Sequence, residues 1–157
     1  MDKIATCLWF DGQAEEAAKF YVSVFKNSRI VETSYYNDAV PSEAGKVLTV
    51  TFELEGREFV GLNGGPQYTF SPAISMFVKC ETQAEVDTLW DKLVEGGAPV
   101  QCGWLTDRYG MSWQIVPTVM LKFLQDKDRE KSKRAMQAMM GMVKLDIAAL
   151  EKAYDGR

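Results

Sequence analysis

The order of strand-like and helix-like segments repeats along this chain, and this repeat restricts the folds that it can adopt. The first copy predicts a strand, a helix and three further strands at residues 4–10, 14–25, 29–36, 46–54 and 58–62. The second copy predicts the same order at residues 73–79, 83–95, 100–104, 105–107 and 112–116. The halves share little sequence identity, so the repeat β-α-β-β-β is one of pattern.

Local signals support these elements. Ala17, Ala18, Tyr21, Val22 and Phe25 form one apolar stripe at helical spacing. Apolar and polar residues alternate over 46–54, as in a half-buried strand, and the turn after it predicts a hairpin. In the second copy, Thr82 with Glu85 three residues later is a capping box, which predicts the start of a helix.

The predicted fold is therefore α+β, with two βαβββ modules that form curled mixed sheets around a cavity. Residues 1–157 are expected to form a single domain, with modules at about 1–66 and 73–117 and a helical tail at 118–157. Each module's own helix covers one face of its sheet, and the other face stays open until the second module completes it. Such paired open faces predict a concave site for a small ligand.

Composition excludes several functions. The 157 residues contain no histidine, which rules out a histidine-dependent triad, a histidine-ligated zinc and a histidine general base. Three cysteines at unrelated spacings make a disulfide framework improbable, and a cytoplasmic location is expected. The net charge of −4 argues against nucleic acid as a partner, and no apolar run is long enough to span a membrane.

Several motifs carry a family resemblance. They are FDG at 10–12, AEEA at 14–17, FY at 20–21, GLNGGP at 61–66, GWLTDRYG at 103–110, SWQIVP at 112–117 and KLDIAAL at 144–150. With them the chain resembles the PhnB-like branch of the glyoxalase/bleomycin resistance/dioxygenase (vicinal oxygen chelate) superfamily. Many such sequences carry the label 3-demethylubiquinone-9 3-methyltransferase. The resemblance implies a glyoxalase-like fold and a homodimer.

Members of this superfamily that hold a metal use four side chains, commonly His, Glu or Gln. The resemblance places these positions near Thr6, near Gly61, at Ala73 or Ser75, and at Gln114. Only Gln114 could bind a metal well, so we predict no tightly bound metal. No Gly-rich strand-to-helix turn of the nucleotide-binding type is present either, and we therefore expect no cofactor.

The candidate ligand-binding residues come from the positions that the resemblance implies, which give Thr6 and Gly61, from strand alternation, and from the turn after the seventh predicted strand. They are Thr6, Gly61, Ser75, Phe77, Trp104, Asp107, Arg108, Tyr109 and Gln114. Gln114 should face the ligand, with its neighbours Trp113 and Ile115 packed against a helix, or it is a buried amide bonded to its surroundings. Ser75 and Phe77 should line the cavity, whereas residues 74, 76 and 78 should face the core.

For the Asp107-Arg108-Tyr109 segment, two interpretations stay open. It binds an acidic or amide-bearing ligand, or it is a turn that Asp107 caps and in which Gly110 takes the unusual dihedral. Similarly, Met136, Met139, Met140 and Met142 cover either a partner surface or the domain's own core.

The function predicted from the sequence is the binding of a small molecule without a catalytic metal, and no catalytic residue is assigned. One alternative is a superfamily enzyme, whether isomerase, lyase or methyltransferase, with acid-base work by Asp107, Glu53 or Tyr109. The other is a structural or regulatory homodimer with an occluded cavity. The expected partners are a small-molecule ligand and a second copy of the chain, with neither nucleic acid nor membrane.

Overall fold

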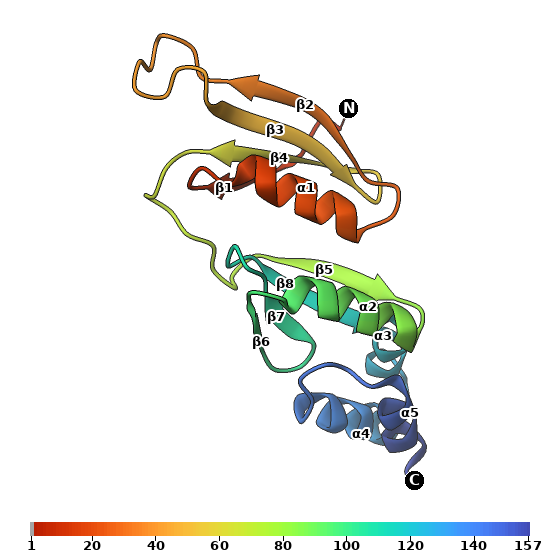
Figure 1. Ribbon diagram of the computed structural model, residues 1–157. Coiled ribbons are helices and arrows are strands. Elements are labelled where there is room, and N and C mark those ends of the chain that lie inside the picture. Colours follow the sequence, from red (N-terminus) through yellow and green to blue (C-terminus); the bar gives the residue numbers. More distant parts are fainter. Residues whose placement is uncertain (1) are drawn as a thin grey trace. The chain divides into compact units, whose positions relative to one another are not determined.

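The chain divides into two compact units, Met1–Thr69 and Phe70–Arg157, in a computed structural model that describes residues 2–157 (Figure 1). The division lies within the loop that the sequence predicts between residues 66 and 73. Each unit contains a four-stranded mixed sheet. The predicted α+β class and the β-α-β-β-β order of both copies are confirmed.

The first unit is built from one helix and one sheet. Its elements are β1 (Thr6–Phe10), α1 (Ala14–Val24), β2 (Arg29–Tyr35), β3 (Val47–Leu54) and β4 (Arg57–Asn63). The strand order is β1-β4-β3-β2, with β1 parallel to β4 and the other pairs antiparallel. The tight turn between β3 and β4 is confirmed, and Glu55 and Gly56 both have positive φ, at 49° and 79°, as the favoured two-residue hairpin turn requires.

Helix α1 covers one face of this sheet through its small and aromatic residues. Ala17 and Tyr21 are fully buried, as are Val50 and Phe52 on β3, and α1 packs against β3 and β4. At the start of the helix, the amide N–H of Ala14 donates to Asn63 Oδ1 at 2.9 Å. A side-chain cap of this kind contributes about 1 kcal/mol, and here it ties α1 to the end of β4.

The second unit repeats this arrangement and adds helices at its end. Its elements are β5 (Ser75–Cys80), α2 (Gln83–Val94), β6 (Ala98–Pro99), β7 (Trp104–Thr106), β8 (Ser112–Pro117), α3 (Thr118–Leu124), α4 (Arg129–Met140) and α5 (Ile147–Asp155). The strand order is β5-β8-β7-β6, with β5 parallel to β8. Within residues 2–157, no helix has the length and apolar character that crossing a bilayer requires.

Helix α2 begins as the capping box predicts. The N–H of Glu85 donates to Thr82 Oγ1 at 3.2 Å, and the Glu85 carboxylate accepts from the N–H of Glu81 at 3.3 Å. The predicted strand at 100–104 is wrong, because Cys102 and Gly103 have φ of 59° and 83° and form a turn before β7. Left-handed backbone of this kind interrupts a strand ladder.

The C-terminal helices form a small hydrophobic core of their own, and hydrogen bonds connect this part of the unit to α2. Met120, Ala135 and Leu150 are completely buried in it. Gln83 on α2 donates to the carbonyl of Leu145 at 3.1 Å and accepts from the N–H of Ile147 at 2.8 Å. One side chain therefore connects α2 to the start of α5.

The methionines of α4 and its end differ in burial, and a partner surface for the exposed ones stays a prediction. Met139 and Met142 pack against the C-terminal core, whereas Met136 and Met140 are exposed at 45% and 61%.

Candidate functional site

The candidate site lies on the face of the second sheet opposite α2, which we call the far face. Trp104 on β7 is paired with Gln114 on β8, and Gln114 is paired with Phe77 on β5. Residues paired in this way point to the same side of a sheet, so the three side chains form one row across three strands. Phe77 is 47% exposed, while Trp104 and Gln114 are half-buried.

A second row of hydroxyl groups lies beside the first. Thr106, Ser112 and Ser75 are paired across the same three strands. The Gln114 amide joins the two rows, since its Nε2 donates to Ser75 Oγ at 2.9 Å. The structure thus brings together Ser75, Phe77, Trp104 and Gln114, four of the candidate residues.

The opposite face of β7 and β8 is core. Trp113 and Ile115, with exposures of 1% and 0%, are buried on the α2 side, as strand alternation predicts. The predicted strand at 73–79 begins before β5, which starts at Ser75. Ile74 precedes the strand and is 70% exposed, so its predicted place in the core is wrong.

Asp107 also belongs to this core side. Its carboxylate is 3% exposed and accepts three hydrogen bonds, from Trp113 Nε1 at 2.8 Å, the N–H of Tyr109 at 2.8 Å and the N–H of Met111 at 3.0 Å. These bonds favour the turn interpretation of Asp107, because its oxygens hold a turn and a buried tryptophan, and a buried carboxylate needs such partners.

The turn interpretation therefore describes residues 107–110. The N–H of Gly110 donates to the carbonyl of Asp107 at 2.9 Å, and Gly110 has a φ of 86°. Arg108 is exposed at the turn, beside Gly96, and Tyr109 is half-buried in it. Arg108 and Tyr109 lie in this turn between β7 and β8, and a ligand contact for them stays a prediction.

In the first unit, Gly61 and Thr6 lie on the helix-covered face of their sheet. A Cβ built on Gly61 would lie 3.3 Å from Ala14 Cβ of α1, and Gly61 is paired with the buried Leu8. Thr6 has the same alternation as Leu8 and Phe10, and it is exposed at the start of β1. They therefore lie on the side of the sheet that α1 covers, and a ligand contact for them stays a prediction.

The side chain that β1 places on its other face is Trp9, which the sequence analysis did not single out. Trp9 Nε1 donates to the carbonyl of Gly65 at 2.9 Å, and its ring meets that of Tyr68 edge-on, with centroids 4.9 Å apart. A Cβ on Gly64 would lie 2.3 Å from the Trp9 ring, so only glycine fits there. The alternation of Leu8, Trp9 and Phe10 is the signal that could have identified this residue.

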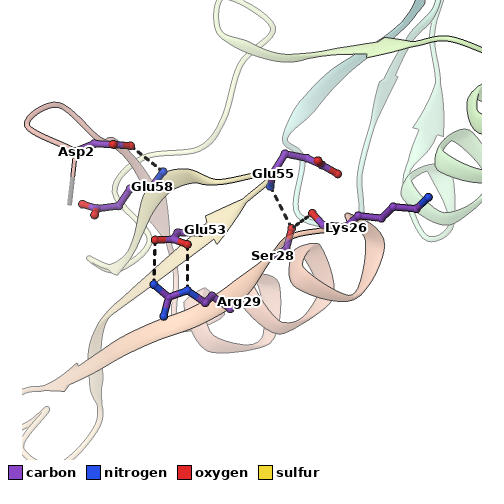
Figure 2. Close-up of polar contacts among 7 residues, drawn as sticks. All are labelled: Asp2, Lys26, Ser28, Arg29, Glu53, Glu55 and Glu58. Atoms are coloured by element: carbon purple, nitrogen blue, oxygen red, sulfur yellow. Dashed lines mark hydrogen bonds and ion pairs between the residues drawn. The ribbon is translucent and has the colours of Figure 1, made fainter.

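The carboxylate of Glu53, a candidate for acid-base work, is held by an arginine. Arg29 donates to it through Nε at 3.1 Å and Nη2 at 3.3 Å, across the β2–β3 pair (Figure 2). Two backbone N–H groups donate to side chains at the same end of the sheet. The N–H of Glu55 donates to Ser28 Oγ, and the N–H of Glu58 donates to the Asp2 carboxylate. This two-pronged ion pair holds the Glu53 carboxylate against Arg29.

The thiols of Cys7 and Cys80 are not activated. Burial, together with the neighbouring charges of Glu85 and Glu81, raises the pKa of Cys80 to about 12, and burial also raises the pKa of Cys7. Because the thiolate is the nucleophile, neither thiol is prepared for nucleophilic chemistry at neutral pH.

The four positions that the superfamily resemblance assigns to a metal do not fit a divalent cation. Gly61 has no side chain and its α-carbon faces α1, while Thr6 and Ser75 offer only neutral hydroxyl oxygens. Gln114 offers one amide oxygen, and its nitrogen is bonded to Ser75. Within residues 2–157, no group of three or more Cys, Asp or Glu side chains is arranged to share a metal ion. Such a neutral donor set competes poorly with water.

Comparisons with known proteins agree with this architecture. Residues 2–116 match the family described as 3-demethylubiquinone-9 3-methyltransferase. A solved Bacillus cereus structure, described as a PhnB protein and 3-demethylubiquinone-9 3-methyltransferase, is 41% identical with a TM-score of 0.68, over 74% of this chain and 99% of that chain. No curated protein sequence matches.

Two more distant structures share the fold alone. A Pseudomonas aeruginosa protein is 20% identical with a TM-score of 0.61, over 74% of this chain and 98% of that one. The fosfomycin resistance protein FosX of Listeria monocytogenes is 13% identical with a TM-score of 0.52, over 80% of this chain and 98% of that one.

The two βαβββ units thus define an α+β protein with the glyoxalase-like fold. The chain belongs to the 3-demethylubiquinone-9 3-methyltransferase family, as does the Bacillus cereus structure described as a PhnB protein. The family match ends at residue 116, so helices α3 to α5 lie beyond it.

Proposed function

We propose that this protein binds a small, planar, largely apolar molecule on the far face of its second unit, without a catalytic metal. The observation that carries the proposal is the row of Trp104, Gln114 and Phe77, two aromatic side chains on either side of an amide. Aromatic walls with one well-placed polar group are typical of small-molecule sites. The bond from Gln114 to Ser75 holds the amide in one orientation.

The reaction of an enzyme has less support. Of the acid-base candidates, Asp107 is committed to three hydrogen bonds and Glu53 to an arginine. General acid-base catalysis needs a titratable side chain that can reach a substrate proton. Asp107 and Glu53 are held by other groups, and Tyr109, the third candidate, lies in the turn of residues 107–110, so binding is the function that the arrangement supports best.

The methyl transfer named in the family description is likewise not our proposal. A nucleotide-like methyl donor normally rests on a Gly-rich turn from a strand into a helix. The two corresponding turns precede α1 and α2, and their helix N-termini are capped by Asn63 and Thr82. The residues present do not fit such a donor.

The test uses the four tryptophans of the chain. Protein labelled with 5-fluorotryptophan is titrated with a panel of planar aromatic fragments, and the fluorine resonances are assigned by single Trp→Phe variants. We expect bound fragments to shift the resonance of Trp104 while that of Trp113, on the opposite face of the same sheet, stays in place.

Variants and metal analysis complete the test. Gln114→Ala should weaken binding, and Glu53→Gln, a change in the first unit, should leave it unaltered. Titration curves that are the same for Gln114→Ala and the wild type would refute the assignment. Stoichiometric divalent metal in purified protein would refute its metal-free part.

A further inference from the structure

The C-terminal helices border the candidate site, although they lie beyond the family match. Val116 on β8 belongs to their hydrophobic core, and it points to the same side of the sheet as Gln114, two residues before it. On the neighbouring strand β7, Trp104 is paired with Gln114. The core of α3 to α5 therefore begins one row away from the row of Trp104, Gln114 and Phe77.

A short segment between α4 and α5, residues 142–145, is bonded to the turn before β7, and we call this segment the strap. The N–H of Cys102 donates to the carbonyl of Met142 at 2.8 Å, and the N–H of Gly103 donates to that of Val143 at 2.7 Å. These bonds join segments that are far apart in the sequence. The strap thus holds the turn from outside the second βαβββ module.

The turn needs this support because its backbone is in an unusual conformation. Cys102 and Gly103 both have positive φ, at 59° and 83°. The left-handed region is disfavoured for a residue with a Cβ, so Cys102 occupies it only because its surroundings hold it there. Trp104 follows directly, and its N–H donates back across the turn to the carbonyl of Gln101 at 3.1 Å. A change in the turn therefore moves the start of β7, where Trp104 lies.

Leu145 is the side chain through which the strap contacts the turn, and it is 1% exposed. A Cβ built on Gly103 would lie 3.0 Å from Leu145 Cδ1 and 3.1 Å from the carbonyl oxygen of Ile115. The carbonyl of Gly103 accepts from the N–H of Ile115 at 2.8 Å. Gly103 is thus packed between Leu145 of the strap and Ile115 of β8.

We infer that the strap is a positioning element of the ligand-binding face and that Leu145 is its positioning residue, which acts on the ligand through Trp104 without touching it. The inference rests on the proposed function and extends its site to residues beyond the family match. A ligand binds only the fraction of molecules in which Trp104 has the right placement. The apparent affinity therefore falls with that fraction.

The experiment compares two leucines of the same core in the full chain. Leu145 and Leu150 are 1% and 0% exposed, but Leu150 lies on α5, which packs against α3 and α4. Leu145→Ala and Leu150→Ala remove the same group from this core, so both lower stability. The Trp104 fluorine resonance is recorded in each free protein and then during titration with indole, a planar and largely apolar probe.

We expect the Trp104 resonance of free Leu145→Ala to broaden or divide, because the turn then samples more than one conformation. Indole should bind this variant about threefold more weakly, as it does if about a third of the molecules keep the native turn. In Leu150→Ala the resonance and the affinity should be those of the wild type. Leu145→Met, which keeps an apolar side chain of similar volume, should restore both.

If an alanine variant fails to fold, Leu145→Val and Leu150→Val give the same comparison with smaller losses of stability. Equal changes in the two variants would show an effect of stability alone and would overturn the inference, as would an unchanged Trp104 resonance in Leu145→Ala. Both outcomes leave the proposed function standing, because the wild type still binds. If no fragment, indole included, moves the Trp104 resonance of the wild type, the proposed function fails and this inference fails with it.

Discussion

Replacing Asp107 with alanine tests whether this carboxylate supports the fold and not a ligand. The change removes the carboxylate that accepts three hydrogen bonds. Two of the donors, Trp113 Nε1 and the N–H of Met111, belong to buried residues that are 1% and 2% exposed. A buried donor left without an acceptor costs about 1–3 kcal/mol. We therefore expect Asp107→Ala to lower the free energy of unfolding by about 3–5 kcal/mol, with the half-buried N–H of Tyr109 contributing least.

The measurement is urea unfolding followed by far-UV circular dichroism at neutral pH. Asp107→Asn keeps one acceptor oxygen and should lose about half as much stability. Lys127→Ala, an exposed position in the loop between α3 and α4, is the control and should change stability by less than about 0.5 kcal/mol. In Trp113→Phe the buried donor is absent, so adding Asp107→Ala to it should cost about 1–2 kcal/mol less than in the wild type.

The opposite result would restore the ligand interpretation. A carboxylate whose role is to bind a ligand commonly adds nothing to the stability of the fold, or lowers it. Replacing such a carboxylate leaves the protein as stable as before or more stable. A loss of less than about 1 kcal/mol in Asp107→Ala, combined with weaker binding of aromatic probes, would refute the reasoning given for this residue.

Three further outcomes are expected. A Cβ on Gly97 would lie 2.0 Å from the carbonyl oxygen of Thr106, a backbone atom. Gly97→Ala should therefore lower the free energy of unfolding by more than about 3 kcal/mol in the same urea assay. A loss under about 1 kcal/mol would contradict this packing. The hydrogen bond from Tyr154 lowers the pKa of Asp126, while that carboxylate raises the pKa of Tyr154. The bond thus stabilises the folded state above the carboxyl pKa and below the phenol pKa of the unfolded chain. The melting temperature of Tyr154→Phe should therefore be lower than that of the wild type between about pH 4 and pH 10, and the difference should shrink on either side of this range. Finally, we propose a homodimer, for which analytical ultracentrifugation should give twice the 17.7 kDa of one chain; a monomer at micromolar concentration would exclude it.

Much of the fold follows from the sequence because its signals are local. The apolar stripe of α1, the capping box at Thr82 and the alternation of β3 each depend on residues a few positions apart. The sequence did not predict the turn before β7, because Cys102 adopts a left-handed φ and cysteine is not a residue type that indicates this conformation. Its N–H donates to the carbonyl of Met142 at 2.8 Å, a contact between segments 40 positions apart in the chain.

For the site, alternation within a strand was enough to place Ser75, Phe77 and Gln114 on one side, since the side-chain period of a strand is two. The register between strands is different, because it depends on how whole elements pair. Only the tertiary structure decides that Trp104, Gln114 and Phe77 share a row, that Gly61 faces a helix, and that Asp107 turns inward to a buried indole. The sequence by itself determined which groups the chain can offer, and packing decided which of them are already bonded to one another.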